Sequence, residues 1–177
     1  DYLHFHNHLE VGFCYYGEGT VTFKEEDLPF DGNMFTVVPK NFPHTTTSTG
    51  DSISYWEWLF IDADKFLREV YKDNPRMAQK VIDRVNKRAH FVRVQDKPQI
   101  GALVQQIIEC MRERKEFYLE EVKGLILAFL LQVARWNREE AEKAEFEAGN
   151  TSLITPAIDY ISECCDRPIK VEELAAM

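Results

Sequence analysis

The stretch LHFHNHLEVGFCYYGEG, residues 3–19, carries three histidines at alternate positions, His4, His6 and His8, followed by the carboxylate of Glu10. In a strand, alternate residues face one side, so His4, His6 and Glu10 share a face. His4 and His6 would lie roughly 7 Å apart at Cα, but a straight strand from His4 to Glu10 would be roughly 20 Å long. One ion or ligand can contact all of them only if the chain bends near His8.

Three interpretations of this stretch stay open on the residues alone. Imidazole nitrogens and a carboxylate suit a zinc, nickel, iron or manganese ion without choosing among them. The same side chains could line a pocket that senses a small ligand, or form a hydrogen-bonded polar cluster at the mouth of a barrel. We expect His8 to lie outside the cluster, and His90, at the start of a later strand, to be structural.

Residues 1–61 consist of short apolar and aromatic runs, which predicts β structure. Turn formers separate the runs at roughly 8–12-residue spacing, as in a sandwich or barrel; the runs are LEVGFCYY, TVTF, MFTVV and SISYWEWLFI. The Gly-Glu-Gly of residues 17–19 favours a tight hairpin because glycine accepts positive φ. Tyr16, Trp56 and Trp58 are candidates to line a cavity, since flat aromatic walls hold small ligands, sugars included.

The pattern becomes helical after residue 62. Two short helices are predicted over 63–73 and 76–88, and a strand over 90–94. An amphipathic helix then begins after Pro98, and a second long helix spans 119–137.

This second long helix is apolar on two faces and therefore needs two partners. Its second face, made of Leu127, Leu131 and Ala134, packs either within the chain or against another subunit. We take these three residues as the candidate dimer interface.

Length and composition exclude several classes of protein. A chain of 177 residues with 45% hydrophobic and 29% charged residues fits one globular domain, or one domain with an appendage. It contains no run of about 18 apolar residues and no signal-peptide pattern. Its four cysteines lack the spacing of a disulfide framework, which favours free thiols and a cytoplasmic location. The net charge of −9 offers no basic face for duplex DNA.

The opening stretch resembles the first motif of the cupin superfamily, through His4, His6, Glu10 and Gly17. The segment GNMFTVVPKNFPH resembles the second motif, through Gly32, Pro39 and His44, although Asn41 and Ser48 replace its usual glycine and asparagine. Cupins are double-sheet β-barrels with a cavity. The resemblance implies a metal set of His4, His6, Glu10 and His44. We take as candidate ligand-binding residues His6, Glu10, His44, Tyr16, Trp56 and Trp58, with His4 at the rim of the cavity.

The C-terminal segment ITPAIDYISECCDRPIKVEELAAM, residues 154–177, resembles the start of a helix-turn-helix domain. With the barrel and the helices, it makes the whole chain resemble the AraC family of bacterial transcription regulators. The resemblance implies an α+β fold in three parts: residues 1–95, a cupin-like ligand-sensing barrel with a short helical insertion; 96–148, an antiparallel helix pair for dimerisation and a linker; and 149–177, the first helices of a truncated helix-turn-helix domain.

The same resemblance implies a function. The chain would be the sensing and dimerisation part of a homodimeric regulator, in which a small effector such as a sugar controls DNA binding. We expect DNA contact only through a C-terminal domain beyond Met177, since recognition helices read base edges and none is present here. We expect no enzyme activity and no required cofactor. The alternatives are a metal-dependent cupin enzyme, such as an isomerase or dioxygenase, and a structural module with an empty barrel.

Overall fold

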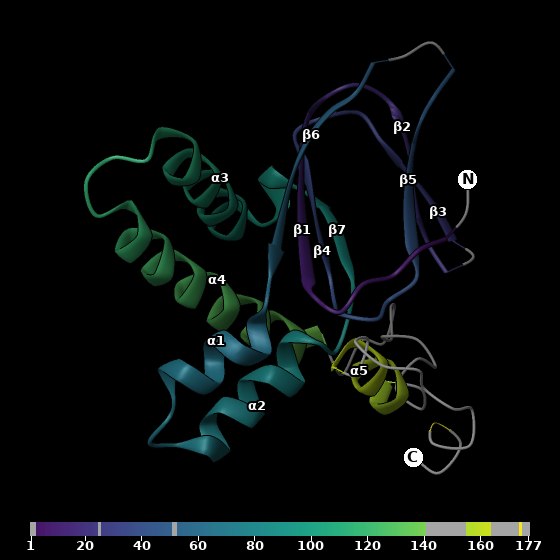
Figure 1. The fold of residues 1–177 in the computed structure, drawn as a ribbon. Helices are drawn as coiled ribbons and strands as arrows, with labels where there is room; N and C mark the ends of the chain where they lie inside the picture. Colours follow the sequence, from purple (N-terminus) through teal and green to yellow (C-terminus); the bar gives the residue numbers. More distant parts are fainter. Residues whose placement is uncertain (1–2, 25, 51–52, 141–154, 164–173, 175–177) are drawn as a thin grey trace.

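The computed structural model describes residues 3–24, 26–50, 53–140, 155–163 and 174, and Figure 1 shows how they are arranged. The strands are β1 (Leu9–Tyr16), β2 (Gly19–Phe23), β3 (Glu26–Phe30), β4 (Met34–Val38), β5 (His44–Ser48), β6 (Tyr55–Ile61) and β7 (His90–Arg93). The helices are α1 (Ala63–Val70), α2 (Pro75–Val85), α3 (Pro98–Glu113), α4 (Tyr118–Glu140) and α5 (Thr155–Glu163), with a short 3-10 turn over Val94–Asp96.

Two antiparallel sheets face each other, in the strand orders β6-β1-β4-β7 and β3-β2-β5. Because side chains alternate along a strand, β1 contributes to two cores. Val11 and Phe13 belong to the cluster beneath the helices, whereas Cys14 packs with Val21 of the opposite sheet. Glu10 shares the Cys14 side and so enters the barrel interior. This mixed fold agrees with the predicted cupin-like double sheet.

The turn at residues 17–19 is not the predicted hairpin. β1 pairs with β4 and β6, whereas β2 pairs with β3 and β5, so the turn carries the chain from one sheet to the other. Gly17 has φ +103°, and a Cβ there would lie 2.4 Å from the Cα of Ser54. The glycine is therefore needed for a crossover between sheets, a role that turn composition alone does not distinguish from a hairpin.

Two of the seven strands have weak apolar patterns, and the sequence did not predict them. β3 reads EDLPF and β5 reads HTTTS. β3 is an edge strand, where the missing N–H of Pro29 is tolerated. Each strand places one large side chain inside, Phe30 in β3 and His44 in β5, both buried. One buried side chain per strand leaves too little alternation for a periodic signal.

The predicted break between the two short helices is confirmed. The side-chain oxygen of Asn74 accepts a hydrogen bond from the N–H of Met77 at 3.2 Å and so caps α2. Pro75 occupies the first helical position, where a missing N–H leaves no hydrogen bond unmade. The helices end at residues 70 and 85 rather than at the predicted 73 and 88.

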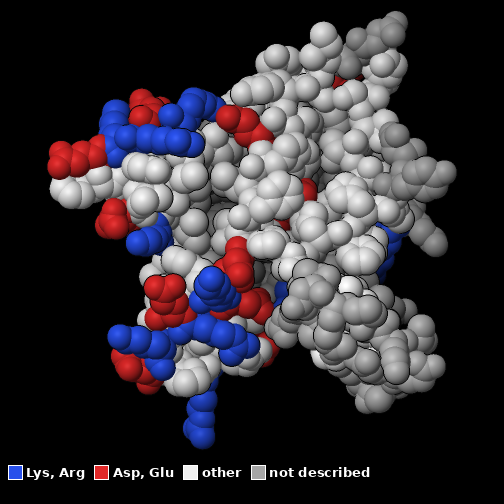
Figure 2. All heavy atoms as spheres, in the orientation of Figure 1, with Lys and Arg blue, Asp and Glu red and all other residues white. Residues whose placement is uncertain are grey.

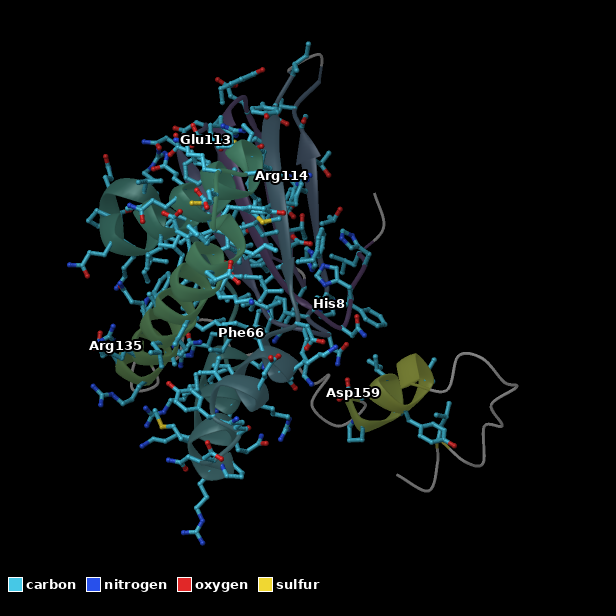
Figure 3. The ribbon with its side chains drawn as sticks, turned by 60° about the vertical axis from the view of Figure 1, so that its left-hand side comes forward. His8, Phe66, Glu113, Arg114, Arg135 and Asp159 are labelled. Carbon is cyan, nitrogen blue, oxygen red and sulfur yellow. The ribbon has the colours of Figure 1, made fainter. Side chains whose placement is uncertain are left out.

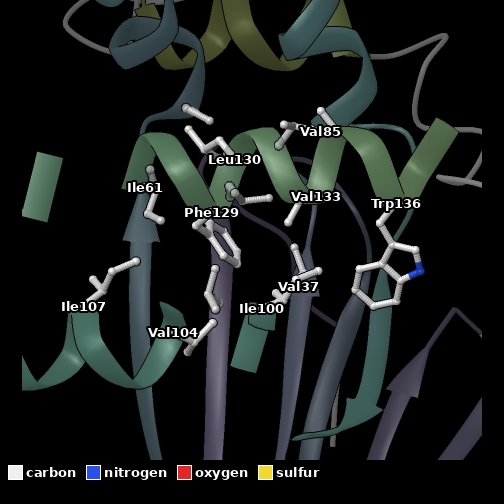
Figure 4. Close-up of a cluster of buried hydrophobic side chains, with 14 of the residues drawn as sticks. Val37, Ile61, Val85, Ile100, Val104, Ile107, Phe129, Leu130, Val133 and Trp136 are labelled. Carbon is white, nitrogen blue, oxygen red and sulfur yellow. The ribbon is translucent and has the colours of Figure 1, made fainter. Parts of the chain in front are cut away.

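Helix α4 is buried on two sides within one chain (Figure 4). Phe129 and Val133 lie over the sheet and α3, while Leu130 lies beside Val85 of α2. Ala134 belongs to the same cluster and is only 4% exposed. Its assignment to a subunit interface is therefore wrong, because its side chain is already buried within the chain.

The other two residues of the candidate interface, Leu127 and Leu131, remain half-buried at the edge of the main core. They stay candidates for a subunit contact.

The C-terminal segment is described only in part. α5 coincides with the first predicted helix of the helix-turn-helix start. The rest of that segment, residues 164–177, lies outside the described residues except for Leu174, and the predicted linker lies outside them from residue 141 onward.

Charged side chains are unevenly distributed over the face of the molecule drawn in Figure 2. Figure 2 shows Lys, Arg, Asp and Glu side chains gathered over α1, α2 and the α3–α4 turn, whereas the barrel surface turned toward the viewer is mostly uncharged. None of the helices in the described part of the chain is long and apolar enough to span a bilayer.

Candidate functional site

A bend in the chain brings the opening histidines to the barrel. His4 forms an isolated antiparallel bridge with His44, with both backbone N–H···O distances at 3.0 Å. The chain then bends at residues 7–8, and β1 begins at Leu9. The bend required by the strand geometry is confirmed, and it folds His6 back toward Glu10.

The bend brings four side chains together at one corner of the barrel. One ligand atom from each lies within 4.8 Å of the others, and the residues are His4, His6, Glu10 and His44. The Nε2 of His6 is 2.6 Å from a carboxylate oxygen of Glu10, and the Nε2 of His44 is 3.3 Å from the same carboxylate. Glu10 and His44 are 3% and 2% exposed, His6 is half-buried and His4 is exposed at the rim. We refer to His6, Glu10 and His44 as the polar corner.

Backbone carbonyls fix the orientation of two imidazole rings. The Nδ1 of His6 lies 3.1 Å from the carbonyl oxygen of His8, and the Nδ1 of His44 lies 2.8 Å from that of Phe42. A carbonyl oxygen only accepts hydrogen bonds, so each Nδ1 carries a hydrogen. Each neutral ring would then point an Nε2 lone pair at the Glu10 carboxylate, which repels it. The polar corner therefore requires a positive charge, either a proton on an imidazole or a bound cation.

The electrostatics of the apo corner favour the proton. The hydrogen bond to Glu10 raises the pKa of His6. Burial alone would raise the pKa of Glu10, but the hydrogen bonds from His44 and His6 outweigh it and bring that pKa to about 2. Burial, together with the neighbouring His44, lowers the pKa of His4. The corner thus favours a buried carboxylate at Glu10 and a proton on His6, and it disfavours a proton on His4 at its rim.

An aromatic wall continues from the polar corner along β6. The rings of Trp56 and Trp58 are stacked at a centroid distance of 4.9 Å and an interplanar angle of 8°. Phe60, two residues further along, meets the ring of His6 edge-on at 5.1 Å. Trp58 and Phe60 are 37% and 57% exposed, so part of the wall is accessible. The alternation that places both tryptophans together also places Phe60 there, although the sequence analysis did not include it.

A glycine in β1 makes room for this wall. Gly12 pairs with Trp58, and a Cβ at Gly12 would lie 2.3 Å from the Trp58 ring and 2.7 Å from the Oγ1 of Thr36. The N–H of Gly12 also donates a hydrogen bond to that Oγ1 at 3.0 Å. Trp58 can lie flat against β1 only because residue 12 has no side chain.

Tyr16 does not belong to the aromatic wall. The pairing of β1 with β6 changes register between Cys14 and Tyr16. Such an irregularity shifts the side chains that follow it relative to strict alternation. Tyr16 is 56% exposed and stacks on Tyr55, a neighbour of the helix-facing Tyr15. The prediction that Tyr16 lines the cavity with the tryptophans is therefore wrong.

Two buried polar groups near the barrel interior have no hydrogen-bond partner within the described residues. They are the side-chain amide of Asn41, which is fully buried, and the indole N–H of Trp56. Buried donors and acceptors are nearly always paired in folded proteins. An unpaired indole N–H in the aromatic wall is therefore consistent with a ligand that accepts a hydrogen bond there.

Two hollows of the described surface lie away from the polar corner. One, of about 550 Å³, sits between the start of α3 and the end of α4 and is lined by residues that include Lys97, Arg135 and Trp136. The other, of about 420 Å³, lies at the α3–α4 turn beside Cys110. We place the candidate site at the polar corner because three histidines and one glutamate of the described residues converge there as possible ligands.

The donor set of the corner fits a divalent metal ion. Three imidazoles and one carboxylate are ligands that zinc, nickel, iron and manganese accept. Metal-bound histidines usually donate their second ring N–H to a carbonyl or carboxylate, as His6 and His44 do here. An ion held by His4, His6, Glu10 and His44 would also supply the positive charge that the corner requires.

Comparison with known proteins identifies the family of the barrel. The family model of the AraC-like ligand binding domain matches residues 2–130, which include the barrel, α1 to α3 and the first half of α4. A search of curated proteins found no match. The match covers the polar corner and the aromatic wall and ends before α5. The chain therefore belongs to the family of AraC-like ligand-binding domains.

Proposed function

We propose that this chain is the effector-sensing part of an AraC-type transcription regulator, and that a small molecule binds between the polar corner and the aromatic wall. One observation carries the proposal: the carboxyl group of Glu10, 3% exposed, lies inside the barrel on the same face of β1 as Gly12, which pairs with Trp58 of the partly accessible stacked tryptophan pair. Burying a charge is costly unless it is paired. A core that served only stability would not need this charge.

The chemistry of the site favours one class of effector. Glu10 accepts hydrogen bonds, and the imidazolium of His6 donates one. The flat face of Trp58 offers an apolar surface for a ring. A small polyhydroxylated ring, such as a sugar, would satisfy all of these groups at once: its hydroxyls would bind Glu10 and the indole N–H of Trp56, and its C–H face would lie on the aromatic wall.

A screen of small molecules tests this assignment. A panel of sugars, organic acids and amines is screened for compounds that raise the melting temperature of the chain. These compounds are then titrated by calorimetry into the parent and into the variants Glu10→Gln and His44→Ala. We expect both variants to weaken binding by at least about tenfold, since each loses a hydrogen bond to a charged group. His8→Ala is the matched control, because the His8 side chain lies outside the polar corner. Equal binding in all four folded proteins would place the effector elsewhere.

The convergence of the four ligand atoms favours a second candidate, a metal-dependent cupin enzyme. A bound ion would act there as a Lewis acid, while His4, His6, Glu10 and His44 would hold it. Titration of metal-free protein with Zn²⁺, Ni²⁺, Mn²⁺ and anaerobic Fe²⁺ distinguishes the candidates. Binding of one ion per chain that His6→Ala abolishes and His8→Ala retains supports the metal site. If no ion binds and none raises the melting temperature, the metal-dependent enzyme is contradicted, while the effector-sensing function is not affected.

The regulatory output is part of the same proposal. Leu127 and Leu131 of α4 are the described residues that we assign to contact with a second copy. DNA contact is assigned to the helix-turn-helix domain that the C-terminal residues 149–177 begin. A ligand can shift such an assembly only if it binds one arrangement of it more tightly than another.

A further inference from the structure

The loop between β4 and β5 connects the barrel to the C-terminal helix. Lys40 in this loop is half-buried, and its Nζ lies 2.9 Å from the Oδ2 of Asp64 on α1 and 3.4 Å from the Oδ2 of Asp159 on α5. Figure 3 shows Asp159 on the side of α5 that is turned toward the barrel. One ammonium group thus bridges the barrel, the first helix and the helix-turn-helix start.

The two carboxylates around Lys40 are held differently. Asp64 also accepts a hydrogen bond from the side-chain amide of Asn86 at 3.3 Å, which ties it to the end of α2. Among the described residues, Asp159 makes its polar contact with Lys40, and the Asp159 side chain is 39% exposed. Burial opposes the charge on Lys40, but Asp64 and Asp159 together raise its pKa. The Lys40–Asp64 pair is therefore a fixed charged point, and α5 is the element that can leave it.

The same loop is also attached to the polar corner. The N–H of Asn41 donates a hydrogen bond of 2.7 Å to the carbonyl oxygen of His6. The carbonyl oxygen of Phe42 accepts the 2.8 Å hydrogen bond from His44 Nδ1. Asn41 has φ +59° and is fully buried, so the loop has little freedom to move without its neighbours. A shift of either imidazole is thus transmitted through one or two residues to Lys40.

We infer that Lys40 is the docking residue for the C-terminal helix α5, and that the state of the polar corner sets how firmly α5 is held. This inference rests on the proposed function, because it takes the corner to be the effector site. It assigns a role to the loop from Pro39 to His44: a ligand that moves His6 or His44 alters the position of Lys40 and so releases or retains the segment that begins the DNA-binding domain.

Hydrogen exchange of α5 tests the docking contact. Amides of residues 157–163 are followed by mass spectrometry in the 177-residue chain and in the variants Lys40→Met, Asp159→Asn and the double variant. We expect exchange to be roughly threefold faster in each single variant than in the parent, which is the scale of an exposed ion pair. Exchange in the double variant should be no faster than in either single variant, because both changes remove the same contact. Lys65→Met, a substitution of an exposed lysine of α1, is the control and should leave α5 unchanged.

Coupling to the corner is tested with Glu10→Gln. This change should speed exchange in α5 in the parent and have no further effect when Lys40→Met is already present. If α5 exchanges at the same rate in Lys40→Met and in the parent, the docking role is overturned. If it exchanges at the same rate in Glu10→Gln and in the parent, the coupling is overturned. Because coupling between two sites is reciprocal, Lys40→Met should change small-molecule affinity by no more than about threefold. The effector site itself fails only if Glu10→Gln and His44→Ala bind as the parent does, so the failure of this inference and the failure of the proposed function remain distinguishable.

Discussion

Glu10 keeps its charge inside a β-barrel because two imidazoles face it. Its pKa of about 2 lies below the ordinary 4.5, so the folded state prefers the carboxylate. The pKa of His6 is raised above the ordinary 6.5, so the folded state prefers the imidazolium. Each preference is a contribution to stability that depends on pH. The Glu10–His6 pair is the most specific chemical feature of the chain, and the lowered pKa of Glu10 depends on both His44 and His6.

The sign of each contribution follows from the direction of the shift. The contribution of Glu10 is present above pH 4.5 and is lost as the pH falls toward 2. The contribution of His6 is present below pH 6.5 and is lost as the pH rises through its raised pKa. We therefore predict that the corner stabilises the metal-free protein most between pH 4.5 and 6.5, with the Glu10 part on the order of 2–3 kcal/mol.

Urea unfolding at a series of pH values, in the presence of a chelator, measures this dependence. Glu10→Gln should flatten the stability profile on both sides of the maximum, while His8→Ala should leave its shape unchanged. A profile that is the same in Glu10→Gln and in the parent would show that the pair does not form.

The strands and turns position the corner, and here sequence patterns succeed and fail for physical reasons. The need for a bend between His6 and Glu10 followed from strand rise alone, and the chain does bend there. The exclusion of Tyr16 from the wall could not be predicted, because the register shift after Cys14 depends on the pairing with β6. The turn at residues 17–19 was recognised as a turn, but the choice of partner strand is a tertiary property.

Gly12 gives a prediction at the level of the β1–β6 pair. Gly12→Ala places a methyl group against the Trp58 ring and the Thr36 hydroxyl, so we expect it to reduce the free energy of unfolding by about 1–3 kcal/mol. It should also displace Trp58 and weaken effector binding. The control is Gly124→Ala in α4, where a Cβ meets nothing within 4 Å; it should raise stability by about 0.5–1 kcal/mol.

Chemical denaturation and tryptophan fluorescence of both variants check the prediction. Gly12→Ala that is as stable as the parent, with an unchanged emission spectrum, would mean that Trp58 does not lie flat against β1.

At the scale of the whole molecule, helix α4 is the element that packs against both the barrel and α2. α4 buries Phe129 and Val133 over the barrel and Ala134 within the same core cluster, and it leaves Leu127 and Leu131 half-buried. Sequence periodicity showed that this helix needs two partners, but it could not show that α2 supplies most of the second one. Leu127 and Leu131 remain the described candidates for a subunit contact.

We predict that Leu127→Glu combined with Leu131→Glu weakens self-association by on the order of 100-fold or more, since two apolar anchors are lost. Sedimentation equilibrium measures it, with Val70→Glu as a control for the same change at an exposed apolar residue of α1. A parent chain that is monomeric at high concentration would contradict the dimer, and an undisturbed dimer of the double variant would contradict this face.

The central claim is that the polar corner and the aromatic wall form one effector site, and native mass spectrometry tests it most directly. The parent, His8→Ala, Glu10→Gln and His44→Ala are each exposed to the small-molecule fraction of a bacterial extract, desalted and weighed intact. We predict one adduct of the same mass on the parent and on His8→Ala, and its loss from Glu10→Gln and His44→Ala. The same adduct on all four proteins, or none on the parent, would contradict the claim.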